Sequence, residues 1–170
     1  MPVNIPPLYS NDWKSELKRM MFADMKAKYP EAYKAGGGDS WKLNIPSEKT
    51  ANGLTRLIMR FLKLKGHYCN RINTQGQART GKVLRYDPFT KKAIYSSEVK
   101  WTKGQTTRGT PDIDAIIYGK AVKIEVKVGK DRMSEDQIKQ MGAIEESGGL
   151  YFVARDMQTF YDWYYLNFSA

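Results

Sequence analysis

Apolar residues recur at helical spacing in two long segments of the chain. The stronger pattern predicts a helix that is opened by Pro46-Ser47-Glu48, with Ser47 as its N-cap, and that ends at Gly66. Its apolar positions all fall on one face: Leu54, Leu57, Ile58, Phe61 and Leu62. A stripe of this width is typical of a helix that packs against a hydrophobic core.

An earlier helix is predicted from Asn11 or Asp12 to about Lys34, where three consecutive glycines end it. Its apolar residues at helical spacing are Trp13, Leu17, Met20, Met21 and Met25. We interpret residues 1–45 as an N-terminal arm and helix, appended to a single globular domain of residues 46–170.

Period-two alternation predicts strands in the rest of the chain. Three short strands at 68–72, 82–86 and 93–98 would form a β-meander within residues 67–108. A hairpin of strands 112–118 and 121–128 follows, with its turn at Gly119-Lys120. A helix capped by Ser134, a strand at 150–154 and a last helix opened by Asp156 complete the order. This order predicts an α/β (α+β) fold with a central mixed β-sheet flanked by helices, and an N-terminal helical extension.

The second hairpin strand separates apolar from charged residues. Val122, Ile124, Val126 and Val128 share one face, and Lys123, Glu125 and Lys127 share the other. In the preceding strand, Asp112 and Asp114 share a face by the same rule. Antiparallel pairing through the turn would bring Asp112 close to Glu125 or Val126.

Two carboxylates and a lysine in this arrangement suit a hard divalent cation. Mg²⁺ usually takes one or two carboxylates and keeps several waters. Asp112 and Glu125 would supply the carboxylates, and the backbone carbonyl of Val126 a further oxygen. Lys127 would stabilise the charge that develops on a phosphoryl group, or orient the attacking water. Asp114 is a further candidate at the same face.

Composition narrows the chemistry. The chain has 170 residues, one cysteine and one histidine. One His and one Cys cannot build a zinc cluster, and His67 lies outside any motif, so it is expected to pack rather than catalyse. The single Cys69 fits a reducing compartment. Residues 1–10 do not resemble a signal peptide, and we expect a cytoplasmic protein.

The net charge of +10 is unevenly distributed. Residues 54–108 hold 13 basic and 2 acidic residues, a net charge of +11, whereas residues 109–170 carry −3. A basic block next to an acidic site indicates a polyanionic partner such as nucleic acid. We expect five residues to bind its backbone: Arg71, Arg79, Lys82, Arg85 and Arg108. The aromatics among them, Tyr86, Phe89, Tyr95 and Trp101, suit either base stacking or core packing.

Residues 47–155 resemble the PD-(D/E)xK phosphodiesterase superfamily, which has the restriction-endonuclease-like fold. They are most similar to its virus-type replication-repair nuclease (VRR-NUC) group, found in phages and bacteria. The resemblance rests on four short motifs: Gly109-Thr110-Pro111-Asp112, Glu125-Val126-Lys127, Ser134-Glu135-Asp136-Gln137, and Gly148-Gly149 before Tyr151-Phe152-Val153.

The resemblance implies a nuclease that hydrolyses DNA phosphodiester bonds with Mg²⁺ or Mn²⁺, leaving a 5′-phosphate and a 3′-hydroxyl. Asp112 and Glu125 would bind the metal, and Lys127 would be catalytic. The family's additional glutamate and glutamine would map to Glu48, as a further catalytic residue and metal ligand, and to the catalytic residue Gln137. No base-reading motif is visible in the sequence, so we expect a structure-selective or nonspecific endonuclease. The resemblance implies a role in replication, repair or recombination in a bacterial or phage-infected cell, and members of this fold often form homodimers.

Other interpretations stay open at this point. Ser134 and Gln137 also form a capping box, and an acid such as Glu48 is favoured in a first helical turn by the helix dipole alone. A catalytically silent nuclease fold could bind nucleic acid without cutting it. Tyr161, Tyr164 and Tyr165 could form an interaction or dimer face, or belong to the core.

Overall fold

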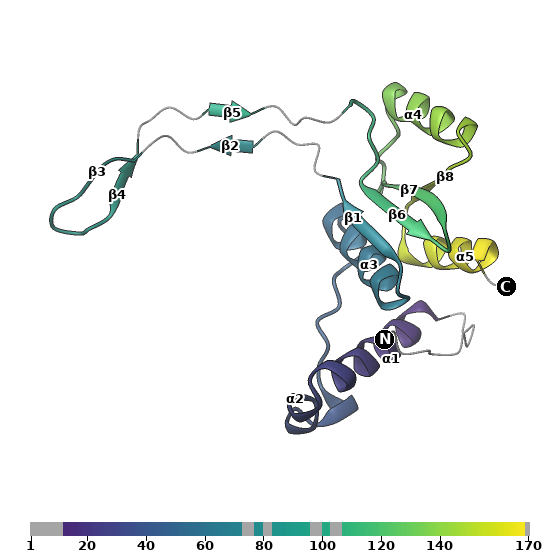
Figure 1. Ribbon diagram of the computed structural model, residues 1–170, viewed down its shortest axis with the longest axis horizontal. Helices are drawn as coiled ribbons and strands as arrows, with labels where there is room; N and C mark the ends of the chain where they lie inside the picture. Colours follow the sequence, from purple (N-terminus) through teal and green to yellow (C-terminus); the bar gives the residue numbers. More distant parts are fainter. Residues whose placement is uncertain (1–11, 73–76, 80–82, 96–99, 103–106, 169–170) are drawn as a thin grey trace.

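The computed structural model describes residues 12–72, 77–79, 83–95, 100–102 and 107–168 (Figure 1). Its centre is a four-stranded mixed sheet in the order β1-β6-β7-β8. The strands are β1 (Tyr68–Arg71), β6 (Ile113–Ile117), β7 (Lys120–Val126) and β8 (Leu150–Ala154). β1, β6 and β7 are antiparallel, and β8 pairs parallel with β7. The predicted α/β class, with a mixed sheet flanked by helices, is confirmed.

The hairpin of β6 and β7 is where the sequence predicted it. Its register pairs Ile113 with Ile124 and Ile117 with Lys120. Tyr118 and Gly119 form the turn, and both have positive φ, +47° and +80°. Two such residues match the twist of the flanking strands. The turn therefore lies one residue earlier than the predicted Gly119-Lys120.

Helices cover both faces of the sheet (Figure 1). α3 (Ala51–Leu64) and α5 (Met157–Phe168) pack on one face, and α4 (Glu135–Glu146) lies on the other. The predicted apolar stripe of α3 is confirmed, because all five of its residues are fully buried: Leu54, Leu57, Ile58, Phe61 and Leu62. They meet the inward residues of β6 and β7 in one core.

α3 begins later than predicted. Its N-cap is Thr50, whose hydroxyl accepts the N–H of Gly53 at 3.1 Å. Ser47 instead accepts the N–H of Lys49 in the preceding turn. That turn packs so closely on the helix that a Cβ on Gly53 would lie 1.7 Å from the Ser47 carbonyl oxygen. The predicted N-cap at Ser47 is therefore wrong, because the chain folds back on Gly53 before the helix starts.

The predicted N-terminal helix is two helices. α1 (Trp13–Lys28) is capped by Asp12, as predicted, and α2 (Pro30–Ala35) follows directly. Pro30 causes the break, because its ring disfavours helical backbone at the preceding Tyr29. A 3₁₀ turn, η1 (Gly38–Ser40), begins at the third of the three consecutive glycines.

α1 is joined to α3 and α5 by a buried polar cluster. Glu16 is 3% exposed, and its carboxylate accepts hydrogen bonds from Lys65 at 2.5 Å, from Tyr165 at 2.6 Å and from Tyr161. Burial acts to raise the pKa of Glu16, but these hydrogen bonds together hold that pKa below its ordinary value. Trp13, Leu17 and Met20 bury the rest of this face of α1 in the same core.

The aromatic residues of α5 belong to the core. Tyr161, Tyr164 and Tyr165 are all buried, and their rings pack edge-on around Phe61 or one another. Their burial contradicts the interpretation of these three residues as an exposed interaction face. His67 packs here too, with its ring nitrogen 2.7 Å from the Tyr164 hydroxyl.

Four short strands of residues 77–79, 83–86, 93–95 and 100–102 form an arm rather than a meander of the main sheet (Figure 1). β2 (Gln77–Arg79) pairs with β5 (Lys100–Thr102), and β3 (Val83–Tyr86) pairs with β4 (Ala93–Tyr95). The first predicted strand of the meander is β1, which joins the main sheet by pairing with β6. The predictions for residues 1–11, for Lys82 and for 96–98 lie outside the described residues.

The Glu16 cluster gives a test of how firmly α1 belongs to the domain. Glu16→Ala removes the acceptor of three buried donors, so we expect the free energy of unfolding to fall by about 3 kcal/mol or more. Glu31→Ala on α2 is the matched control, because it also removes one glutamate but one whose side chain is 90% exposed. Urea denaturation measures both, and an equal effect of the two substitutions would contradict the structural role of Glu16.

Candidate active site

The charged face of β7 lies under α4. Val122, Ile124 and Val126 point into the core on the other face. Glu125 is 3% exposed and Lys127 is 7% exposed, so neither side chain extends into open solvent. Charged side chains are rarely buried to this degree unless they are paired.

Asp112 bonds to the backbone of the Glu-x-Lys segment. It comes directly before β6, and its Oδ2 accepts the N–H of Val126 at 2.9 Å. Pro111, one position earlier, has no N–H and cannot continue the β6–β7 ladder as a donor to the Val126 carbonyl. The aspartate side chain thus bonds where the ladder ends, and Asp112, Glu125 and Lys127 come together as predicted.

The two carboxylate oxygens of Glu125 have different surroundings. Oε1 accepts the side-chain amide of Gln137 and lies 3.1 Å from the Lys127 ammonium. Oε2 is buried and has no hydrogen-bond partner among the described residues. Burial and the nearby charge of Asp112 raise the pKa of Glu125, although Lys127 acts in the opposite direction. Lys127 therefore does not fully offset the effects of burial and of Asp112 on the negative charge of Glu125.

Lys127 lies just past the end of β7. Its N–H donates to the Ala154 carbonyl at 2.9 Å, which extends the parallel pairing with β8 by one bond. Its ammonium is also 3.6 Å from Asp131, which is exposed. Sequence reasoning did not single out Asp131, because it lies in the loop after the strand with no motif around it.

Gln137 forms the predicted capping box and also contacts Glu125, whereas its catalytic role remains a prediction. Its Oε1 accepts the Ser134 N–H at 2.9 Å and the Ser134 hydroxyl accepts the Gln137 N–H at 3.3 Å, which together form a capping box. The Nε2 of the same amide donates to Glu125. The cap of α4 therefore also orients a donor at the buried carboxylate.

A close backbone approach holds α4 beside Asp112. Gly109 has a φ of +80°, and a Cβ there would lie 2.3 Å from the Asp136 carbonyl oxygen. Only glycine fits such a position. Residues 107–110 and the start of α4 together border a cavity of about 320 Å³, lined in part by Arg108 and Gln137.

Glu48 and Asp114 have partners outside this cluster. The Oε2 of Glu48 accepts the N–H of Met157 at 3.0 Å, at the start of α5. This places Glu48 near the edge of the sheet where β8 ends, and its site role remains a prediction. Asp114 forms an ion pair with its cross-strand partner Lys123.

Tyr151 is a site neighbour that sequence reasoning missed. It lies on β8 opposite Lys123, two positions before the partner of Glu125. Its hydroxyl is buried and has no partner among the described residues, and burial together with the charges of Glu125 and Asp112 raises its pKa. Strand alternation could have found it, because Tyr151 and Val153 share one face of β8.

The donor set fits a hard cation. Within the described part of the chain, no three His, Cys, Asp or Glu residues are grouped as a metal cluster. Two carboxylates, one with a buried oxygen that lacks a partner among the described residues, match Mg²⁺ or Mn²⁺, which leave other positions to water and phosphate. Zinc sites in proteins are usually built with His or Cys ligands, and this set has neither.

The predicted backbone-binding residues are spread over several elements. Arg71 at the end of β1 is exposed and donates to Asn52 at 2.8 Å. Arg85 on β3 and Arg108 before β6 are exposed. Arg79 lies in β2, and Lys82 lies outside the described residues.

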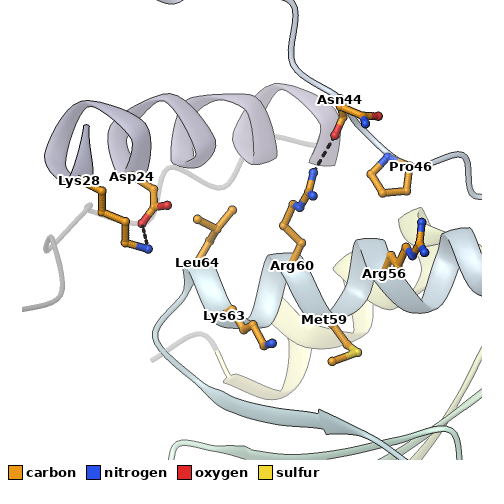
Figure 2. A pocket seen from close by; sticks show the side chains of 9 residues that line it. All are labelled: Asp24, Lys28, Asn44, Pro46, Arg56, Met59, Arg60, Lys63 and Leu64. Atoms are coloured by element: carbon orange, nitrogen blue, oxygen red, sulfur yellow. Dashed lines mark hydrogen bonds and ion pairs between the residues drawn. The ribbon is translucent and has the colours of Figure 1, made fainter. Parts of the chain in front are cut away.

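A second group of cations lines a cavity of about 580 Å³ between α1 and α3 (Figure 2). Its lining includes the acidic residue Asp24 and four basic residues: Lys28, Arg56, Arg60 and Lys63. Arg60 donates to the Asn44 carbonyl at 2.7 Å, and Lys28 pairs with Asp24 at 2.8 Å (Figure 2). Part of the basic block therefore lies on the outer side of α3.

No protein-family model matches the chain, and no curated protein matches it either. No helix among the described residues is long and apolar enough to cross a membrane. The nuclease resemblance therefore remains a prediction from the four motifs.

The raised pKa of Glu125 predicts that this residue destabilises the metal-free protein at neutral pH. Its pKa is higher in the folded chain than in the unfolded chain, where it is near 4.5. The free energy of unfolding therefore falls as the pH rises from the unfolded value through the folded value. We expect Glu125→Gln to melt at a higher temperature than the wild type at pH 7 in EDTA, with the difference shrinking toward pH 4.5.

Adding Mn²⁺ should then raise the melting temperature of the wild type and leave that of Glu125→Gln nearly unchanged. A lower melting temperature for Glu125→Gln in EDTA would show that its pairing with Lys127 outweighs the cost of burial.

Proposed function

We propose that the protein is a metal-dependent nuclease that hydrolyses DNA phosphodiester bonds. The observation that carries the proposal is the buried Oε2 of Glu125, which has no partner among the described residues and lies in a set with Asp112 and Lys127. A buried carboxylate of this kind is costly unless a ligand completes it. A site of this charge pattern suits a divalent cation and a phosphodiester.

Asp112, Glu125 and the Val126 carbonyl would hold Mg²⁺ or Mn²⁺. The bound ion would supply Lewis-acid chemistry, lowering the pKa of a bound water and polarising the phosphoryl oxygen. Glu48 would be a further ligand, through the carboxylate whose Oε2 accepts the Met157 N–H.

The protein's own groups have separate tasks in this proposal. Lys127 would stabilise negative charge on the phosphoryl oxygens, because its ammonium is held beside Glu125 by β7 and β8. Gln137 would keep the Glu125 carboxylate in one orientation through its amide. The Tyr151 hydroxyl is available to donate to a ligand in this space.

The distribution of charge supports a nucleic-acid substrate. Exposed cations lie on β1, on the arm, before β6 and around the α1–α3 cavity. Such a spread neutralises phosphates without reading sequence. Together with the motifs, it favours a structure-selective or nonspecific endonuclease of phage or bacterial replication, repair or recombination.

Three substitutions test the site. We expect Asp112→Ala, Glu125→Ala and Lys127→Ala each to reduce the rate of Mg²⁺-dependent DNA cleavage at least about 100-fold, because each removes a group that contacts the metal or the phosphate. Asp114→Ala is the matched control, since it removes a carboxylate from β6 that pairs with Lys123. It should retain cleavage within a few-fold.

The assay uses single-stranded, duplex, flap and branched DNA, with RNA as a comparison. Equal cleavage by the wild type and all three site variants would overturn the proposed site. Tight binding without cleavage of any substrate would favour the silent binding module, and cleavage of RNA alone would change the substrate class.

Gln137→Glu separates the cap from the site. A glutamate can still accept the Ser134 N–H, so the helical circular dichroism should not change. It replaces a donor to Glu125 with a like charge, so we expect the cleavage rate at pH 7 to fall about tenfold or more and its pH profile to move to higher pH. Gln140→Glu on the same helix is the control, and equal profiles for the two variants would contradict the role of Gln137.

A further inference from the structure

The tip of the arm holds an aromatic ring on a fixed turn. The Asp87 carboxylate accepts the N–H groups of Phe89 at 2.8 Å and Thr90 at 2.9 Å. The Asp87 backbone also bonds Lys91 and Lys92, each at 2.9 Å. Lys91 has a φ of +56°, which lets the chain reverse within this short loop. Phe89 is therefore presented by an ordered backbone.

The apolar side chains of this hairpin are exposed to solvent. Phe89 is 94% exposed, and Leu84 and Tyr86 are each 66% exposed. β3 and β4 form a sheet of their own and pair with no other strand among the described residues. The sequence left open whether the aromatic residues pack in the core or stack on bases. Their exposure excludes core packing for Tyr86 and Phe89. Three exposed apolar side chains within one short hairpin suit a partner that covers them.

The charges around the ring restrict that partner. Three basic residues of the hairpin are exposed: Arg85, Lys91 and Lys92. Asp87 is the one acidic residue among residues 83–95. Its carboxylate is already bonded to the turn. A second copy of the tip would bring like charges together, which disfavours self-association through it. A nucleic-acid strand offers both phosphates and flat aromatic faces.

We propose that the arm tip binds a strand with unpaired bases, with Phe89 stacked on one base and Lys91 and Lys92 on the flanking phosphates. The inference rests on the proposed function, because that strand would be the substrate. Bases inside a continuous duplex are already stacked on each other. The tip would therefore favour single strands, flaps and branch points, and would make the nuclease structure-selective.

The test measures binding without cleavage, in EDTA. The fluorescence anisotropy of a labelled single-stranded oligonucleotide and of a blunt duplex gives the affinity for each. We expect Phe89→Ala to weaken binding of the single strand about tenfold, the size of one lost base–aromatic contact, and to change duplex binding less than about twofold. Phe89→Trp should retain single-strand affinity. Leu166→Ala, at a side chain of α5 that is 85% exposed, is the control for loss of an apolar surface group.

Salt dependence separates stacking from charge. The double variant Lys91→Ala/Lys92→Ala should reduce the slope of log affinity against log salt concentration by about 1.4, which corresponds to two phosphate contacts on a single strand. Phe89→Ala should shift that line down with its slope unchanged, because a stacked ring releases no counterions.

Three results would overturn the inference alone: unchanged single-strand affinity in Phe89→Ala, an equal loss on duplex, or a change of sedimentation coefficient that reveals self-association through Phe89. Failure of the wild type to bind any nucleic acid would overturn both the inference and the proposed function. A stacking effect of Phe89 without metal-dependent cleavage of any substrate would retain the binding of unpaired bases by the tip, and would overturn the nuclease and the role of that strand as its substrate.

Discussion

The burial of β7 on both faces is the constraint on which the fold and the candidate site depend. Its apolar face is covered by α3 and α5, and this fixes the direction of every second side chain on the opposite face. Glu125 and Lys127 must then be accommodated under α4, where neither can be hydrated freely. The start of β6, the cap of α4 and the end of β8 each place a group beside them.

Two glutamates in this chain are equally buried and differ in how well they are satisfied. Glu16 and Glu125 are both 3% exposed. Glu16 accepts one ammonium and two phenol donors, and its pKa lies below the ordinary value. Glu125 has a buried oxygen without a partner among the described residues, and its pKa is raised. The first carboxylate stabilises the fold, whereas the second is suited to a ligand.

Local patterns predicted most of the core and failed where distant segments meet. The α3 stripe, the β6–β7 hairpin and the capping box of α4 follow from spacing that a few neighbouring residues enforce. The start of α3 was wrong because the chain folds back on Gly53, a contact that residue spacing does not show. The arm was predicted as a meander, because short strands reveal their own alternation but not which strand pairs with which.

The sequence by itself determined that Asp112, Glu125 and Lys127 lie close together, because strand periodicity and a short hairpin leave few ways to separate them. Tertiary structure decided what surrounds them. It directed the Gln137 amide to Glu125, placed the Tyr151 hydroxyl beside the acids, bonded Glu48 to α5 and left Phe89 in solvent. These outcomes depend on how separate elements pack, and packing is set by the shape of the whole core rather than by neighbours in the chain.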